Sequence, residues 1–376
     1  MADKSLSLYF VAGEASGDLH GARLMAALWA RLPRVTFHGH GGDKMKAAGL
    51  ELQYHSDDLS LMGFTEVIKH LPFMMKVMGE TVNAIAELQP DRIILIDYPG
   101  FNLRLLKRIA ALNIPVTYFI LPQVWAWKEK RLEILKTHVD QAISIFPFEP
   151  AWFRERGLVT DYVGHPLVDR EITGEQIQAF LTRHELDSRK PILVLLPGSR
   201  QQEVDRHWPV FINTAQELMR RRPDLQCVVG QAPGVELPLL PPTIRREITD
   251  IPAAIHQATA ALAASGTVTL EAALLDTPVV VCYRLSPLSW WLAKRLVRVP
   301  YASMVNLIGN KDIVPEFLQA SMKEDNLVAA LEPLLTGESR DRKMMLADFE
   351  TVRRALGMPG VYDRIADTIA RRLVES

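Results

Sequence analysis

The sequence predicts an α/β protein made of two doubly wound, Rossmann-like domains. Short apolar runs that end in glycine-containing loops alternate with helix-like stretches, which is typical of a parallel sheet covered by helices. This pattern begins near residue 6 and begins again near residue 191. The 376 residues exceed a usual single core, so two domains of roughly 150 to 200 residues are expected. Two similar halves of this kind predict a cleft between facing domains.

Composition favours a globular cytoplasmic protein. Hydrophobic residues make up 48% and charged residues 23% of the chain, which is not the profile of a disordered protein. The net charge of −1 provides no basic field for nucleic acid, so we expect no nucleic-acid partner. Cys227 and Cys282 lie in valine-rich runs and are expected to be reduced core residues. We expect neither a signal peptide nor a membrane-spanning segment.

The first expected strand, Leu6–Gly13, leads into the loop GEASGD at residues 13–18. Ligands of doubly wound domains bind at the carboxyl ends of the strands. Glu14, Ser16 and Asp18 are therefore candidate cleft residues. The same loop can also be no more than a turn followed by a helix cap.

Asp97 follows the clearest strand of the first half, at residues 92–96. An acid at the carboxyl end of a parallel strand points into the ligand cleft, so Asp97 is the candidate general base. A helix-capping role fits Asp97 less well, because Pro99 and Gly100 lie between Asp97 and the helix expected from about Leu103.

The motif PQVWAW, at residues 122–127, follows another expected strand at 115–121. Its two tryptophans can stack on a sugar or fill the core. Asn102, Gln123 and Trp125 are included among the possible cleft residues.

The segment 61–79, LMGFTEVIKHLPFMMKVMG, is exceptionally apolar. A buried helix is one interpretation of it. The other is a helix pair, broken at Pro72, that lies on a membrane surface. In the second interpretation the apolar side chains that face lipid are Phe64, Val67, Ile68, Leu71, Phe73, Met74, Met75, Val77 and Met78.

The second half begins with a strand at 191–196 and the loop PGSRQQE at 197–203. Ser199 and Arg200 lie in this loop. An arginine at this position can grip a phosphate with its fork of donors, although it can also be a solvated surface charge.

The stretch 263–281 contains a small-residue turn, Ser265, Gly266 and Thr267, that opens a run of helix formers. The first N–H groups of a helix have no intrahelical partner and carry the positive end of the helix dipole, so a pyrophosphate fits there. Glu271, one turn later, is placed to accept hydrogen bonds from ribose hydroxyls. The alternative is that the turn is only a cap and Glu271 only complements the dipole.

Two further stretches carry aromatic, basic or polar residues in apolar settings. Residues 287–299 place two tryptophans beside three basic residues, which suits either a membrane interface or an ordinary helix end. Asn306 and Glu316 are polar groups within apolar segments.

Taken together, seven motifs closely resemble those of the lipid A disaccharide synthases, in order and from Leu6 to the last helix. They are GEASGD (13–18), IDYPGFN (96–102), PQVWAW (122–127), GHP (164–166), LPGSR followed by EV (196–204), ASGTVTLE (264–271) and VNLIG (305–309). The resemblance implies a GT-B fold, with an acceptor and membrane-facing domain at 1–167, a UDP-sugar donor domain at 168–345, and helices at 346–376 that pack back on the first domain.

The resemblance also implies a reaction at the bacterial inner membrane. Diacylglucosamine would be transferred, with inversion, from UDP-2,3-diacylglucosamine to 2,3-diacylglucosamine 1-phosphate, which yields a β-1,6-linked lipid A disaccharide and UDP. Because both substrates are acylated, contact of residues 61–79 with the membrane or with the substrate acyl chains is then favoured over a buried helix, and the protein is expected on the inner face of the cytoplasmic membrane. A homodimer is also expected as a possible assembly.

Site roles follow motif by motif. Asp97 would deprotonate the acceptor hydroxyl, with Glu14 and Asp18 as rivals for that role. Some family members have Asp where this chain has Gly100, so no second carboxylate is available at that position. The diphosphate would be held by Ser199, Arg200, Ser265, Gly266 and Thr267, the ribose by Glu271, and the donor site would include Asn306.

No cofactor and no metal are expected, because no acidic pair with metal-ligand spacing lies beside the phosphate loops. Two other functions stay open. A nucleotide-sugar epimerase or hydrolase of the same fold would share the phosphate helix, and a non-catalytic membrane adaptor would lack UDP binding altogether.

Overall fold

The computed structural model describes residues 5–59 and 71–375. The described chain divides into two compact units. The first contains the residues up to Asp169 together with those from Met358 onward, and the second is Arg170–Gly357. The domain borders expected from the sequence were at residues 167 and 345. Each unit is an α/β domain with a wholly parallel sheet, as predicted.

The sheet of the first unit has seven strands in the order β3-β2-β1-β4-β5-β6-β7. Their bounds are β1 Leu6–Ala12, β2 Val35–Gly41, β3 Leu50–His55, β4 Arg92–Ile96, β5 Val116–Phe119, β6 Gln141–Ser144 and β7 Asp161–Tyr162. The chain runs outward from β1 to β3 and then returns to place β4 on the other side of β1. The loops after β1 and β4 therefore flank the topological switch point, where ligands of doubly wound domains bind.

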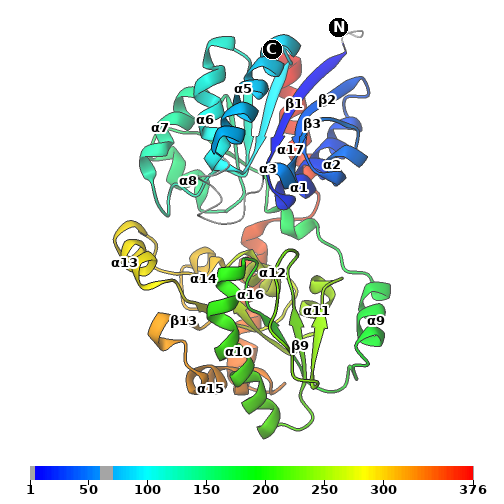
Figure 1. Cartoon of the computed structure of the whole chain (residues 1–376), viewed down its shortest axis with the longest axis vertical. Helices are drawn as coiled ribbons and strands as arrows, with labels where there is room; N and C mark the ends of the chain where they lie inside the picture. Colours follow the sequence, from blue (N-terminus) through cyan, green and yellow to red (C-terminus); the bar gives the residue numbers. More distant parts are fainter. Residues whose placement is uncertain (1–4, 60–70, 376) are drawn as a thin grey trace. The chain divides into compact units, whose positions relative to one another are not determined.

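Helices cover both faces of this sheet (Figure 1). They are α1 Ala15–Trp29, α2 Asp43–Ala47, α3 Ser56–Leu59, α5 Leu71–Leu88, α6 Pro99–Ile109, α7 Leu132–His138, α8 Glu149–Arg154 and α17 Val361–Glu375, with 3₁₀ turns η1 Ala110–Leu112, η2 Glu129–Arg131 and η3 Pro166–Asp169. Alternate residues of β1 enter different cores, because successive side chains of a strand point to opposite faces. Tyr9 and Val11 pack with α5, α6 and α7, whereas Leu8 and Phe10 pack with α1 and α17.

The sheet of the second unit has six strands in the order β10-β9-β8-β11-β12-β13. The strands are β8 Ile192–Leu196, β9 Gln226–Gly230, β10 Ile244–Glu247, β11 Ala260–Ala264, β12 Val279–Tyr283 and β13 Glu316–Leu318. The helices are α9 Gly174–Arg183, α10 Gln201–Arg221, α11 Ile251–Gln257, α12 Thr267–Leu274, α13 Pro287–Leu296, α14 Met304–Gly309, α15 Glu324–Leu334 and α16 Arg340–Leu356, with η4 at Gln319–Ser321. The switch point lies between β8 and β11.

The last two helices belong to different units. α17, red in Figure 1, packs along α1 in the first unit. Asp169 fixes its start, since its carboxylate accepts hydrogen bonds from the N–H groups of Gly360, at 2.6 Å, and Val361, at 2.9 Å. α16 instead packs against α12 and α14 in the second unit.

Helix α10 begins at Gln201, directly after Arg200 of the candidate phosphate loop, and carries Pro209 internally. Proline removes one helical hydrogen bond, here the one to the carbonyl of Asp205. Both Pro209 and Asp205 are exposed, so water can satisfy that carbonyl.

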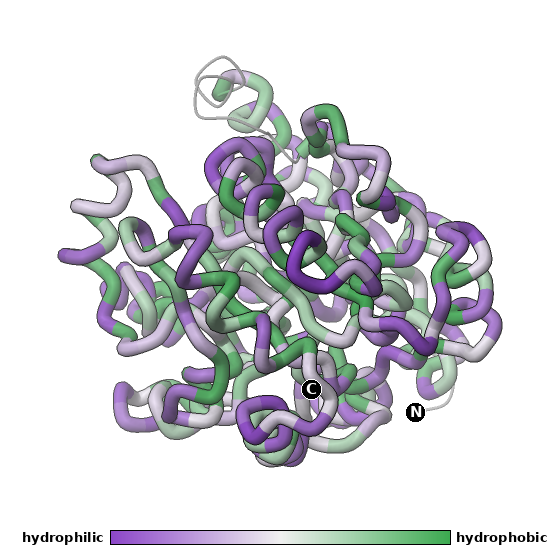
Figure 2. The backbone as a smooth tube through the Cα atoms, turned by 90° about the horizontal axis from the view of Figure 1, so that it is seen from below, coloured by the Kyte–Doolittle hydropathy of each residue, from purple (hydrophilic) through white to green (hydrophobic). Residues whose placement is uncertain are grey.

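Two other expectations concern the interior and the membrane. Cys227 on β9 and Cys282 on β12 are buried free thiols, as predicted. Many helical turns in Figure 2 carry both hydrophobic and hydrophilic segments, as expected for helices that bury one face. Within the described residues, no helix is long and apolar enough to span a bilayer.

Candidate active site

Asp97 lies directly after β4, at the switch point of the first sheet. Asp97 and the next residue, Tyr98, both have left-handed backbone conformations, with φ of 46° and 47°. Consecutive left-handed non-glycine residues are strained, and such strain clusters at functional sites. Burial and, to a smaller extent, the charge of Glu14 raise the pKa of the Asp97 carboxyl, and a hydrogen bond from the Tyr98 N–H lowers it; the net pKa is about 6. A carboxylate with this pKa suits a general base near neutral pH.

The backbone of Asp97 is held independently of its side chain. Its carbonyl accepts hydrogen bonds from the Tyr118 hydroxyl, at 2.7 Å, and from the Asn102 side-chain amide, at 2.8 Å. Its N–H donates to the carbonyl of Phe119 at 3.0 Å. Asn102 is completely buried, so this residue positions the loop from inside rather than facing a ligand.

The loop after β1 packs beside that of β4. A Cβ atom at Gly13 would lie 2.4 Å from the Tyr98 ring, so only glycine permits this close approach. Glu14 and Ser16 are exposed on this loop. Asp18 is buried, and its carboxylate accepts from the N–H groups of Gly42, at 2.7 Å, and Met45, at 2.9 Å. Asp18 therefore caps the start of α2, which argues against its role as a rival base.

The two tryptophans of PQVWAW have different environments. Trp125 is 7% exposed, packs against Phe148, and donates from Nε1 to Glu149 at 2.9 Å. Trp125 is therefore a core residue, which corrects its assignment as a possible cleft contact. It can be buried because Glu149 provides a buried acceptor for its indole N–H. Gln123 and Trp127 are exposed.

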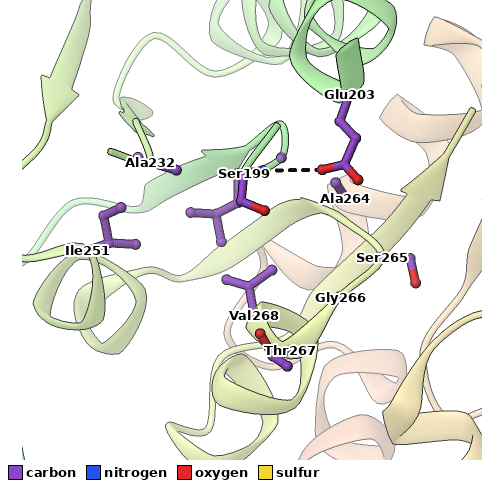
Figure 3. Close-up of a pocket in the computed structure, with 12 residues that line it drawn as sticks. Ser199, Glu203, Ala232, Ile251, Ala264, Ser265, Gly266, Thr267 and Val268 are labelled. Atoms are coloured by element: carbon purple, nitrogen blue, oxygen red, sulfur yellow. Dashed lines mark hydrogen bonds between the residues drawn. The ribbon is translucent and has the colours of Figure 1, made fainter. Parts of the chain in front are cut away.

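A pocket lies at the switch point of the second sheet (Figure 3). It is lined by the ends of β8, β9 and β11, the loops after β8 and β9, and the first turns of α10, α11 and α12: Leu196, Gly198, Ser199, Glu203, Gly230, Ala232, Ile251, Ala264, Ser265, Gly266, Thr267 and Val268. Four of the five residues predicted to hold a diphosphate therefore line one pocket. Arg200, the fifth, follows Ser199 and its side chain is 75% exposed.

Glu203 and His207 support the loop after β8, and neither residue was predicted to do so. Gly198 has φ of 138°, and its Cβ position lies 2.7 Å from the side chain of Glu203. The Glu203 carboxylate accepts from the Ser199 N–H at 3.2 Å (Figure 3). His207 is buried between the Pro197 carbonyl, 2.7 Å from Nδ1, and the Arg284 N–H, 2.9 Å from Nε2. Because it meets one acceptor and one donor, His207 is assigned as neutral with its proton on Nδ1.

Ser265 is joined to a network within the fold. Its hydroxyl donates to the Ala302 carbonyl at 2.7 Å, and its N–H donates to the Cys282 carbonyl at 2.9 Å. The Ala302 N–H in turn donates to Glu316 at 2.8 Å. The N–H groups of the following turn, at the start of α12, are consequently the donors that an anion would meet.

Asn306 is completely buried in the same network, which contradicts its placement at the donor site. Its amide nitrogen donates to the Val314 carbonyl and to Glu316, both at 2.9 Å. Its oxygen accepts from the N–H groups of Ile313 and Val314, also at 2.9 Å. Every polar group of the side chain is used internally, so Asn306 is a scaffold residue.

Glu271, on α12, forms an ion pair with Arg170. Its side chain is 13% exposed. Burial raises the pKa of Glu271, and the charge and hydrogen bond of Arg170 lower it. Its contact with ribose stays a prediction.

Helix α5 contains residues 71–79 of the apolar segment 61–79, and the burial of these residues shows which of them can face lipid. Leu71 and Met75 are 52% and 59% exposed, whereas Phe73 and Met74 pack partly against the core. Val77 and Met78 are core residues, which corrects their assignment to a lipid-facing surface: one face of α5 is needed to cover the sheet. Phe64, Val67 and Ile68 lie outside the described residues.

Comparison with known proteins decides the family. Residues 8–357 match the sequence model of the Lipid-A-disaccharide synthetase family. The chain belongs to this family. The lipid-A-disaccharide synthase of Myxococcus xanthus is 38% identical over 379 residues, covering 96% of both chains. That of Alkalilimnicola ehrlichii is 39% identical over 343 residues, covering 88% of this chain and 89% of the relative.

Solved structures agree on the fold. A UDP-GlcNAc 2-epimerase from Neisseria meningitidis bound to UDP-GlcNAc superposes with a TM-score of 0.63 at 11% identity, covering 99% of both chains. The calicheamicin glycosyltransferase CalG4 superposes with a TM-score of 0.59 at 17% identity, again covering 99% of both chains. The fold is GT-B, and the protein is a hexosyltransferase of lipid A biosynthesis.

Proposed function

We propose that the protein transfers diacylglucosamine from UDP-2,3-diacylglucosamine to the 6-hydroxyl of 2,3-diacylglucosamine 1-phosphate, with inversion, to give a β-1,6-linked disaccharide and UDP. Family membership supports this reaction class. The observation that carries the mechanism is the buried carboxyl of Asp97, which has a pKa of about 6 and stands on a strained, left-handed backbone. Asp97 takes the proton of the acceptor hydroxyl as that oxygen attacks the anomeric carbon. One base and one departing diphosphate are enough for a single inverting displacement.

The pocket of the second unit is proposed to bind the leaving UDP. The first turn of α12 offers N–H groups of Gly266 and Thr267 and the positive end of a helix dipole. Arg200 follows Ser199 on the same loop, and its exposed guanidinium, 3.6 Å from the Glu203 carboxylate, adds a positive charge. Together these groups stabilise the negative charge that develops on the diphosphate.

The dependence of UDP release on acceptor tests this proposal. We expect UDP to form from UDP-2,3-diacylglucosamine only when 2,3-diacylglucosamine 1-phosphate is also supplied. The epimerase of the same fold makes an epimerase or hydrolase the second candidate. Rapid UDP release or donor epimerisation without any acceptor would favour that candidate and contradict the transferase reaction.

Glu271→Gln should weaken UDP binding about tenfold, because one charge-assisted hydrogen bond to ribose is lost. The melting temperature should change little, since Arg170 is 27% exposed and can be solvated once its partner is neutral. Calorimetric titration with UDP measures the affinity. Arg170→Gln is the matched control and should retain UDP binding, because it leaves Glu271 in place. Equal UDP affinity in wild type and Glu271→Gln would return Glu271 to a role in helix stability alone.

We also propose that the protein is peripheral on the inner face of the cytoplasmic membrane. Leu71 and Met75 offer exposed apolar side chains on α5. Helix α13 buries none of its residues, and the centroid of its Trp291 ring lies 3.7 Å from the Arg295 guanidinium carbon. Aromatic rings beside basic groups suit the interface of an anionic bilayer.

The double substitution Leu71→Ser/Met75→Ser should shift the protein from the membrane to the soluble fraction, with an unchanged melting temperature. The reason is that both side chains are exposed, so their loss removes apolar area from lipid and none from the core. Sedimentation with lipid vesicles measures the partition. Val77→Ser, in the same helix but fully buried, should instead lower the melting temperature. Undiminished sedimentation of the double variant would contradict docking through α5.

A further inference from the structure

Two cationic side chains lie over the exposed ring of Trp127, in the loop after β5. Lys128 Nζ is 4.0 Å from the ring centroid and the Arg131 guanidinium carbon is 5.7 Å from it. The indole is 44% exposed. Each cation is attracted to the ring face, but two cations on one ring repel each other. Desolvation and the charge of Arg131 both lower the pKa of Lys128.

The backbone holds this arrangement in place. Lys128 is left-handed, with φ of 57°, which is unfavourable for a side chain of its size. The Arg131 N–H donates to the Lys128 carbonyl at 2.9 Å and closes the turn η2. The turn thereby directs both side chains to the same indole. A strained conformation that brings like charges together needs a compensating interaction.

No carboxylate supplies that interaction within residues 5–59 and 71–375: neither Lys128 nor Arg131 forms an ion pair there. Glu129 lies between them in the sequence, but its carboxylate accepts from Arg156 Nε at 2.8 Å. A pair of cations left without an anion beside an exposed aromatic ring is a site for an anionic ligand with an apolar face.

This cation pair lies at the same end of the sheet as Asp97. β4 and β5 are neighbouring parallel strands, and the loops that carry Asp97 and Trp127 follow their carboxyl ends. Tyr118, on β5, donates its hydroxyl to the Asp97 carbonyl. Burial raises the pKa of Tyr118, the charge of Asp97 raises it further, and the charge of Arg131 lowers it, so both charges act on one hydroxyl.

We propose that Lys128 and Arg131 bind the phosphate monoester of the acceptor while Trp127 stacks against its sugar ring, so that this loop selects a phosphorylated sugar as acceptor. The inference rests on the proposed function. A phosphate dianion neutralises two cations that otherwise repel each other, and the apolar face of a pyranose suits an exposed indole. An anionic phospholipid headgroup carries the same phosphate chemistry, and the experiment separates the two sources.

The test compares wild type with Lys128→Asn/Arg131→Gln. Asparagine tolerates the left-handed conformation, so the turn is retained. Two acceptors are compared: 2,3-diacylglucosamine 1-phosphate, and 2,3-diacylglucosamine, which lacks the phosphate. Both are supplied in neutral detergent micelles that contain no anionic lipid. In the variant, KM for the phosphorylated acceptor should be about 10- to 100-fold higher than in wild type, with kcat nearly unchanged. KM and kcat for the phosphate-free acceptor should be the same in both proteins. The exposed neighbour Lys130→Gln removes one charge from the same turn and should behave as wild type.

A binding measurement keeps this inference separate from the proposed function. Glucosamine 1-phosphate, which carries the sugar and phosphate without acyl chains, is titrated by calorimetry into both proteins, and this readout does not depend on turnover. Binding to wild type that is lost in the double variant supports the inference, even if wild type forms no disaccharide. Equal binding to both proteins, or an equal loss of activity with both acceptors, overturns it. So does a defect that appears only when anionic lipid is added, since the loop would then bind headgroups.

Discussion

Asp97→Asn should lower kcat for disaccharide formation by about 10²- to 10⁴-fold, the usual loss on removing a general base. UDP affinity should be unchanged, because the pocket proposed to bind UDP is formed by residues of the second unit. The fold should be retained for two reasons. Asparagine accepts φ of 46°, and it is the carbonyl of Asp97, not its carboxylate, that holds Tyr118 and Asn102. Steady-state kinetics and calorimetry with UDP measure the two effects.

The pH dependence follows from the same carboxyl. Its pKa is about 6 in the folded protein and 3.8 without the fold, so kcat should fall as the pH drops through about 6. The folded state binds the proton more tightly. The stabilisation that the proton provides is therefore complete below pH 3.8 and is lost as the pH rises through about 6. Above that range the ionised carboxylate destabilises the fold, so Asp97→Asn should be more stable than wild type by about 1 to 3 kcal/mol.

Glu14→Gln is the matched control for Asp97→Asn. Glu14 is exposed on the neighbouring loop, and its charge raises the pKa of Asp97. Its neutralisation should preserve kcat at pH 8 and move the acidic limb to lower pH. Loss of activity in Glu14→Gln together with a fully active Asp97→Asn would assign the base to Glu14 instead.

Asn306→Ala should destabilise the protein by about 3 kcal/mol. Four hydrogen bonds of a fully buried side chain are lost, and the Val314 N–H is left without an acceptor, whereas the Ile313 N–H keeps the Lys311 carbonyl. Glu316 also loses one donor, although it keeps the Ala302 and Ser303 N–H groups. Urea denaturation measures the change in the free energy of unfolding.

The matched control is Asn326→Ala, which removes the same side chain from an exposed position in the same unit. It loses one hydrogen bond, to the Ser321 carbonyl, and should change stability by less than about 0.5 kcal/mol. If Asn306→Ala weakens UDP binding at unchanged stability, the residue contacts the donor and the scaffold assignment is wrong.

The strands that determine each domain were predictable where composition and pattern agree. The apolar runs at 92–96 and 192–196, rich in isoleucine, leucine and valine, are strands, as expected. β11, at residues 260–264, was not predicted because its sequence AALAA consists of strong helix formers. Its small side chains are all buried between β8 and β12, so packing of the sheet overrides local propensity.

The location of a pocket at the switch point of the second sheet was also predictable, because its residues follow the carboxyl ends of neighbouring strands. The role of each polar side chain near the site was not predictable. Asn306 and Asp18 looked like ligand contacts, yet their partners are backbone groups from segments that the sequence alone does not bring together. Trp125 and Trp127 differ for a similar reason: only the fold shows that Glu149 lies beside the first and two cations lie over the second.

The most direct test of the central claim is the structure of the product formed from UDP-2,3-diacylglucosamine and 2,3-diacylglucosamine 1-phosphate. Mass spectrometry gives its mass, and NMR gives the configuration and position of the new glycosidic bond. We predict a tetraacyl disaccharide 1-phosphate with a β-1,6 linkage, formed by wild type and not by Asp97→Asn. Free diacylglucosamine, an epimerised UDP-sugar or an α-linked disaccharide as the wild-type product would contradict an inverting transfer with Asp97 as base.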